Sequence, residues 1–126
     1  MNVGYVDTSC LVAVAFSERG AAALARRLEG FDRLVSSNLL EAEFRAACAR
    51  EGVDPDPAQL SVLSWVLPDR SLGDEIGQVL AAGQVRGADC WHLATALYLA
   101  GDSSTIFFLT LDKRQRTVAA KLGFAT

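Results

Sequence analysis

The chain has 126 residues, of which 51% are hydrophobic, and a formal net charge of −3 at pH 7. This length and composition suit one domain with its own core, residues 1–126, and exclude an intrinsically disordered or a repeat protein. The acidic balance argues against a protein that binds nucleic acid by charge alone, but it suits an enzyme whose acidic site is neutralised by metal ions.

No segment is expected to enter a membrane. The apolar runs are much shorter than the roughly 20 residues that span a bilayer, and the N-terminus lacks the basic region of a signal peptide. The cysteines Cys10, Cys48 and Cys90 are widely spaced, and the chain has a single histidine. An odd number of scattered cysteines predicts reduced thiols that fill the core of a cytoplasmic protein, and it argues against a structural zinc site.

Short apolar runs alternate with longer amphipathic runs along the chain. In chain order the predicted elements are a strand at 3–6, helices at 9–16 and 20–28, a strand at 34–37, helices at 38–50 and from 57 to about 66, a short strand starting at 66 and 67, helices at 73–85 and 89–100, a strand at 105–111, a helix at 113–122 and an edge strand starting at 124. Alternating strands and helices imply parallel pairing with crossover helices on both faces. The predicted fold is therefore a three-layer α/β/α domain around a central, mainly parallel sheet.

Two aspartates follow predicted strands of this sheet. Asp7 ends the first strand, and Asp112 ends the strand at 105–111. Ligands of such sheets bind beyond the carboxyl ends of the strands, so both acids are expected at the edge where a site forms. Each of them alone is explained as well by a turn or a helix cap.

The helix at 38–50 carries two glutamates on different faces, because an α-helix has about 3.6 residues per turn. Glu41 lies on the polar edge, four residues before Arg45, which is the spacing of a surface ion pair. Glu43 lies within the apolar stripe, where an acid needs a partner or a cation.

Asp89 opens the helix at 89–100, and a helix N-cap is a good alternative explanation for it. The four acids together favour a shared site over separate caps and turns. Carboxylates gathered at one edge repel one another and raise each other's pKa. A fold keeps such a cluster mainly when a divalent cation neutralises it. Oxygen ligands favour Mg²⁺ or Mn²⁺ over zinc.

With its acids in these settings the sequence resembles the PIN-domain ribonucleases, especially the VapC-type toxins of bacterial toxin–antitoxin pairs. The segment YVDTSCLV is similar to the opening strand of that family, with its acid at Asp7. Three further segments are similar to the later motifs: VSSNLLEAEFRAA with Glu43, RGADCWHLATAL with Asp89, and FLTLDKRQRTVAAKLGF with Asp112. The resemblance covers nearly the whole chain and is poorest at 54–85.

The resemblance implies a single PIN domain at 1–126 that acts as a Mg²⁺- or Mn²⁺-dependent endoribonuclease, cleaving RNA with metal-activated water. It also implies an RNA substrate, a VapB-type antitoxin as partner, and a homodimer. The catalytic and metal-binding residues that it implies are Asp7, Glu43, Asp89 and Asp112.

Residues beside the acids have two explanations each. Thr8, Ser9 and Thr110 are placed to orient a carboxylate or a metal-bound water, or else to cap helices and strand ends. His92 has apolar neighbours, and we expect it to be a packed residue with one hydrogen bond and no catalytic role.

Basic residues are expected near the same edge, where they would hold RNA phosphates. The alternative is a solvated helix face or contacts with an acidic partner segment. These residues are Arg45, Arg86, Lys113, Arg114 and Arg116.

Two other functions compete with the nuclease as explanations of the sequence. A phosphoryl-transfer or receiver-type domain would need an acidic pair after the first strand and a lysine after a late strand, and the sequence has neither. A non-catalytic PIN scaffold that only binds a partner would not need to keep four mutually repelling acids. The non-catalytic scaffold is the remaining alternative to the nuclease.

Overall fold

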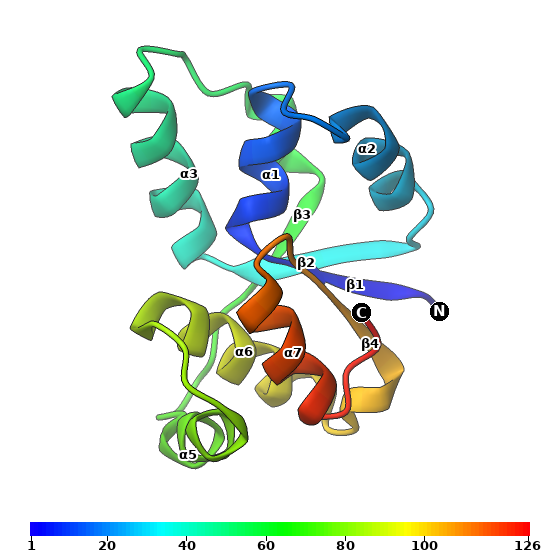
Figure 1. Ribbon diagram of the computed structural model, residues 1–126, viewed down its shortest axis with the longest axis vertical. Helices are drawn as coiled ribbons and strands as arrows, with labels where there is room; N and C mark the ends of the chain where they lie inside the picture. Colours follow the sequence, from blue (N-terminus) through cyan, green and yellow to red (C-terminus); the bar gives the residue numbers. More distant parts are fainter.

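A parallel sheet of four strands forms the centre of the computed structural model, which describes residues 1–126 (Figure 1). The strand order is β3-β2-β1-β4, and every neighbouring pair is parallel. The strands are β1 (Val3–Val6), β2 (Arg33–Ser37), β3 (Leu63–Val66) and β4 (Ile106–Leu109).

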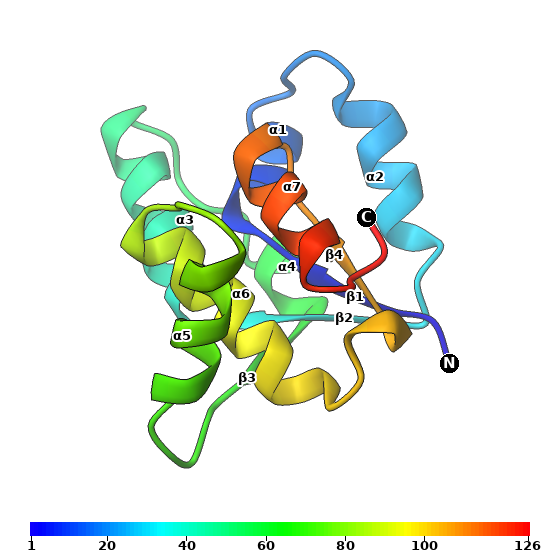
Figure 2. The same cartoon turned by 60° about the horizontal axis from the view of Figure 1, so that its bottom comes forward.

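Helices cover both faces of the sheet. In Figure 1, α1, α2 and α3 lie above the strands and α5, α6 and α7 lie below them, and Figure 2 brings the second group to the front. The helices are α1 (Thr8–Ala15), α2 (Ala21–Glu29), α3 (Leu39–Arg50), α4 (Pro57–Ser61), α5 (Gly73–Ala82), α6 (Gly87–Ala100) and α7 (Lys113–Lys121). The three-layer α/β/α prediction is confirmed.

Each face of the sheet has its own hydrophobic core, because successive side chains of a strand point to opposite faces. Tyr5 of β1 belongs to the core between the sheet and α5, α6 and α7. The next residue, Val6, belongs to the core between the sheet and α1 and α3. Gly4 leaves room for a side chain of the adjacent strand β4, since a Cβ there would lie 2.9 Å from the Leu109 side chain. The central strand is therefore held from both sides, and its carboxyl end is a rigid place for a functional group.

The main error of the sequence prediction lies at 54–85, the region where the resemblance to known motifs is poorest. The helix starting at Pro57 ends at Ser61 rather than near Val66, and the following residues form β3, paired in parallel with β2. Leu63 and Val66 are buried in the two cores, and pairing with β2 outweighs the helical pattern of this short stretch.

Other boundaries differ by a few residues. The helix predicted to reach Val85 ends at Ala82, and the next residue, Gly83, is extended. A Cβ at Gly83 would lie 2.7 Å from Val118 of α7, so a glycine suits this position. The strand predicted from Thr105 begins at Ile106, after a short 3₁₀ turn. The edge strand predicted at Phe124 is reduced to one bridge between Phe107 and Ala125.

No helix combines the length and the apolar character required to cross a bilayer. All three cysteines are free and buried, as predicted for thiols that fill the core.

Candidate functional site

The four acids predicted from the sequence line one hollow of about 300 Å³ at the carboxyl edge of the sheet. Asp7 directly follows β1, and Asp112 lies just beyond β4. Glu43 comes from α3 and Asp89 from α6, so four separate segments contribute to this acid pocket. The remaining lining residues are Thr8, Ser9, Arg86 and Ala88.

Asp7 is held firmly at the end of β1. Its backbone N–H donates to the Leu109 carbonyl at 2.9 Å, and its carboxylate caps α1 by accepting the Ser9 N–H at 3.1 Å. The side-chain amide of Gln115 donates to the other carboxylate oxygen at 3.2 Å. Only 5% of Asp7 is exposed. The capping explanation is thus correct for Asp7, and it coexists with a place in the acid pocket.

Asp112 caps α7, since its carboxylate accepts the Gln115 N–H at 2.9 Å. The buried Thr110 hydroxyl accepts the Asp112 N–H at 3.1 Å and lies 2.7 Å from Gln115 Oε1. Gln115 therefore connects Asp112, Thr110 and Asp7. The sequence analysis missed this residue, although a glutamine one turn before the buried Val118 and Ala119 is a recognisable signal.

Glu43 accepts two hydrogen bonds on the same oxygen, Oε1. The Thr8 hydroxyl and His92 Nε2 each lie 2.8 Å from it. Partial burial raises the pKa of Glu43, but the hydrogen bonds from His92 and Thr8 lower it more, so the net pKa is below its ordinary value. The carboxylate is thus kept ionised, with Oε2 left available to a ligand.

Asp89 is not the N-cap of α6, so that explanation is wrong. The helix begins at Gly87, with Arg86 as its cap, and Asp89 lies in the first turn. Burial and the nearby charges of Asp7 and Asp112 raise the pKa of Asp89. The acids of the pocket therefore repel one another, as expected for carboxylates gathered without a cation.

This repulsion predicts that Asp89→Asn stabilises the metal-free protein at neutral pH. Because folding raises the pKa of Asp89, its ionised form costs folding free energy, and asparagine removes that cost. We expect a gain of roughly a few tenths of a kcal/mol, since solvent screens this half-exposed group. The gain should fade as the pH falls through the raised pKa and vanish once the carboxyl is protonated in both states.

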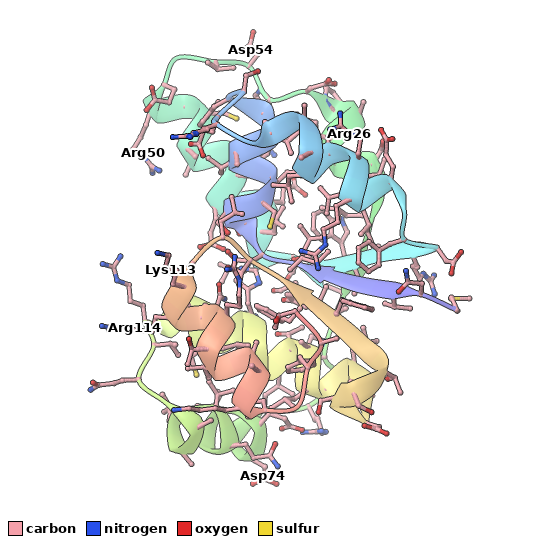
Figure 3. All side chains as sticks on the ribbon, turned by 45° about the vertical axis from the view of Figure 1, so that its right-hand side comes forward. Arg26, Arg50, Asp54, Asp74, Lys113 and Arg114 are labelled. Carbon is pink, nitrogen blue, oxygen red and sulfur yellow. The ribbon has the colours of Figure 1, made fainter.

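Urea unfolding at neutral and at acidic pH measures this effect. Asp54→Asn, in the loop after α3 at the far end of the molecule, is the matched control (Figure 3). A loss of stability with Asp89→Asn at neutral pH would contradict the repulsion.

Three hydroxyl residues contact the acids or the backbone beside them. Thr8 donates to Glu43, and Thr110 lies 3.3 Å from the Asp7 carboxylate. Ser9 acts on the backbone as well, because its hydroxyl accepts the Leu111 N–H at 3.1 Å and so holds the loop that leads to Asp112.

The basic residues predicted near this edge differ in their surroundings. Arg86 lines the acid pocket, and Lys113 and Arg114, at the start of α7, line a neighbouring hollow of about 520 Å³ (Figure 3). Arg45 pairs with Glu41 at 3.1 Å on the exposed edge of α3, which confirms the predicted ion pair. Arg116 donates to the Thr110 carbonyl at 2.8 Å and thereby supports the strand end.

The acid pocket supplies the donor set of a hard divalent cation. No three of its acidic side chains are arranged as a ready-made cage around one ion. Mg²⁺ does not need such a cage, because it keeps several waters and is usually held by one or two carboxylates together with substrate phosphates. Four carboxylates, one with a raised pKa, fit this kind of site.

The sequence is similar to known proteins over nearly its whole length. The profile of the PIN domain matches residues 4–121, a segment that contains all four acids. Ribonuclease VapC46 of Mycobacterium tuberculosis is 34% identical over 124 residues, which cover 96% of this chain and 93% of the relative. No solved structure matches the chain.

Proposed function

This chain belongs to the PIN-domain family, and we propose that its residues 1–126 form one VapC-type endoribonuclease domain that hydrolyses RNA phosphodiester bonds with Mg²⁺ or Mn²⁺. The observation that carries the proposal is the meeting of four acids from four segments in one pocket at the carboxyl edge of the sheet. Similarity to a ribonuclease supports RNA as the substrate. The repulsion that raises the pKa of Asp89 supports a cation in the pocket.

In this proposal Asp7, Glu43, Asp89 and Asp112 hold the cation, directly or through water. A bound divalent cation supplies positive charge that acidifies water and stabilises the charge growing on the phosphate. The chain fixes the carboxylates beforehand, Asp7 through Gln115 and Ser9, and Glu43 through Thr8. Preorganised ligands of this kind spare the reorganisation that would otherwise slow the reaction.

The RNA backbone would lie across the acid pocket and the start of α7. Arg86, at the pocket, and Lys113 and Arg114, beside it, are the residues that we propose to hold phosphates. Arg45 already shares its charge with Glu41 and would add less. Phosphate contacts of this kind position a nucleic acid without reading its sequence.

The proposal extends to the partners of the chain. We propose a VapB-type antitoxin, which would block the site most simply by placing a cationic side chain among the four acids. We also propose a homodimer in the cytoplasm, where three free thiols stay reduced. A non-catalytic scaffold that only binds such a partner is the alternative.

Substitutions of two glutamates of α3 distinguish the nuclease from the scaffold. Glu43→Gln removes a charge from the acid pocket and is expected to lower the rate of Mg²⁺-dependent RNA cleavage by about a hundredfold. Glu41→Gln changes an exposed ion pair on the same helix and should leave the rate within about twofold.

The assay uses a mixed pool of structured and unstructured RNA, with and without chelator. Equal rates for both variants and the wild-type protein would favour the scaffold.

A further inference from the structure

We propose that His92 is a positioning residue, which holds the Glu43 carboxylate in place by donating a hydrogen bond from Nε2 in one fixed tautomer. The inference rests on the proposed function, because it assigns a use to Glu43 as a ligand in the acid pocket. It goes beyond the sequence prediction, in which His92 was a packed residue with a single hydrogen bond.

His92 is completely buried, yet both of its ring nitrogens have polar partners. On one side Nε2 lies 2.8 Å from Glu43 Oε1. On the other side Nδ1 lies 2.8 Å from the Tyr5 hydroxyl. The ring thus bridges β1 and α3 across the end of the sheet, from its own position on α6.

The protons of this bridge can be assigned from the backbone outward. The Ser37 N–H donates to the Tyr5 oxygen at 3.0 Å, so the hydroxyl is left with its own proton to donate. Burial raises the pKa of Tyr5, which keeps that proton on the hydroxyl. The Tyr5 O–H then donates to Nδ1, the proton of the neutral ring lies on Nε2, and Nε2–H donates to Glu43.

The residues at the start of this series of hydrogen bonds are held rigidly. Ser37 ends β2, and Tyr5 stacks on Phe108 with ring centroids 5.2 Å apart. The Thr8 hydroxyl adds a second donor to the same Glu43 oxygen. Glu43 is therefore fixed from the sheet and from α1, with Oε2 left for the cation. Outer partners that orient a ligand in this way commonly contribute about 10- to 100-fold to metal affinity.

The tautomer is testable without any metal, because His92 is the only histidine of the chain. Long-range ¹⁵N NMR of the metal-free protein at neutral pH should show one imidazole with the proton on Nε2. Tyr5→Phe removes the donor to Nδ1 and should move the ¹⁵N shift of Nδ1, while the proton stays on Nε2, where Glu43 still accepts it. A wild-type ring protonated only at Nδ1 would overturn the inference.

Metal affinity gives the second readout, by calorimetric titration of Mn²⁺ into the metal-free variants. His92→Leu should weaken binding by about tenfold or more, whereas His92→Gln, whose amide N–H can take the place of Nε2–H, should stay within about threefold of the wild-type protein. Val79→Ala, which truncates a fully buried core residue of α5, should lower stability and leave the affinity unchanged.

Equal affinity in His92→Leu and the wild-type protein, or an affinity in His92→Gln as low as in His92→Leu, would overturn the positioning role. Failure of the wild-type protein itself to bind Mn²⁺ would instead count against the proposed nuclease, while the NMR result still decides the tautomer.

Discussion

Asp7→Asn is expected to lower the rate of RNA cleavage by at least about a hundredfold and to leave the fold intact. Asp7 is the most buried of the four acids, and the Ser9 N–H and the Gln115 side-chain amide hold its carboxylate at the end of β1. Asparagine keeps the size of the side chain and an oxygen that can still cap α1, but it removes the negative charge. The loss therefore falls on cation binding rather than on folding.

Cleavage assays with purified protein measure this prediction, with circular dichroism and urea unfolding to confirm the fold. Asp54→Asn removes the same charge from the exposed loop after α3 and is the matched control. Cleavage by Asp7→Asn at the wild-type rate would show that the acid pocket is not the reacting site.

Phe44→Ala is expected to lower the free energy of unfolding by about 3–5 kcal/mol, because it leaves a cavity in the core beneath α3. Phe44 is fully buried and packs in the cluster that contains Val6 and Leu109. A small domain has only about 5–15 kcal/mol of stability, so the variant should be unfolded at far lower urea concentrations. Phe44 is also one of the buried residues that anchor α3, the helix that carries Glu43.

Urea unfolding followed by circular dichroism measures the loss. Val62→Ala serves as the control, because Val62 is exposed and its truncation should change stability by no more than about 0.5 kcal/mol. A Phe44→Ala variant as stable as Val62→Ala would mean that α3 is not anchored through this side chain.

Most strands and helices of the fold could be predicted, because their sequence signals are local. Val3–Val6 is apolar and ends in a polar turn, and the helix at 38–50 has a clear apolar stripe. The positions of Asp7 and Asp112 followed from the geometry of parallel sheets, in which strand ends share one edge. Glu43 followed from its place on the buried side of its helix.

What could not be predicted depends on contacts between distant segments. Strand β3 exists because its residues pair with β2, and nothing in its short local pattern excludes a helix. Asp89 looked like a helix cap because the start of α6 at Gly87 carries no clear signal.

The residues that support the acids and the strand end through hydrogen bonds could not be predicted either. His92 joins Tyr5 to Glu43, residues that are far apart in the sequence, and Arg116 turns back to the Thr110 carbonyl. Each of these contacts depends on side-chain directions that only the assembled sheet determines.

The proposed metal site is tested most directly by calorimetric titration of Mg²⁺ and Mn²⁺ into the metal-free protein. We expect the wild-type protein to bind, Asp7→Asn and Glu43→Gln to bind at least about tenfold more weakly, and Glu41→Gln to bind as the wild-type protein does. If the wild-type protein binds neither ion, even with RNA present, the acid pocket is not a cation site, and the metal-dependent nuclease is contradicted.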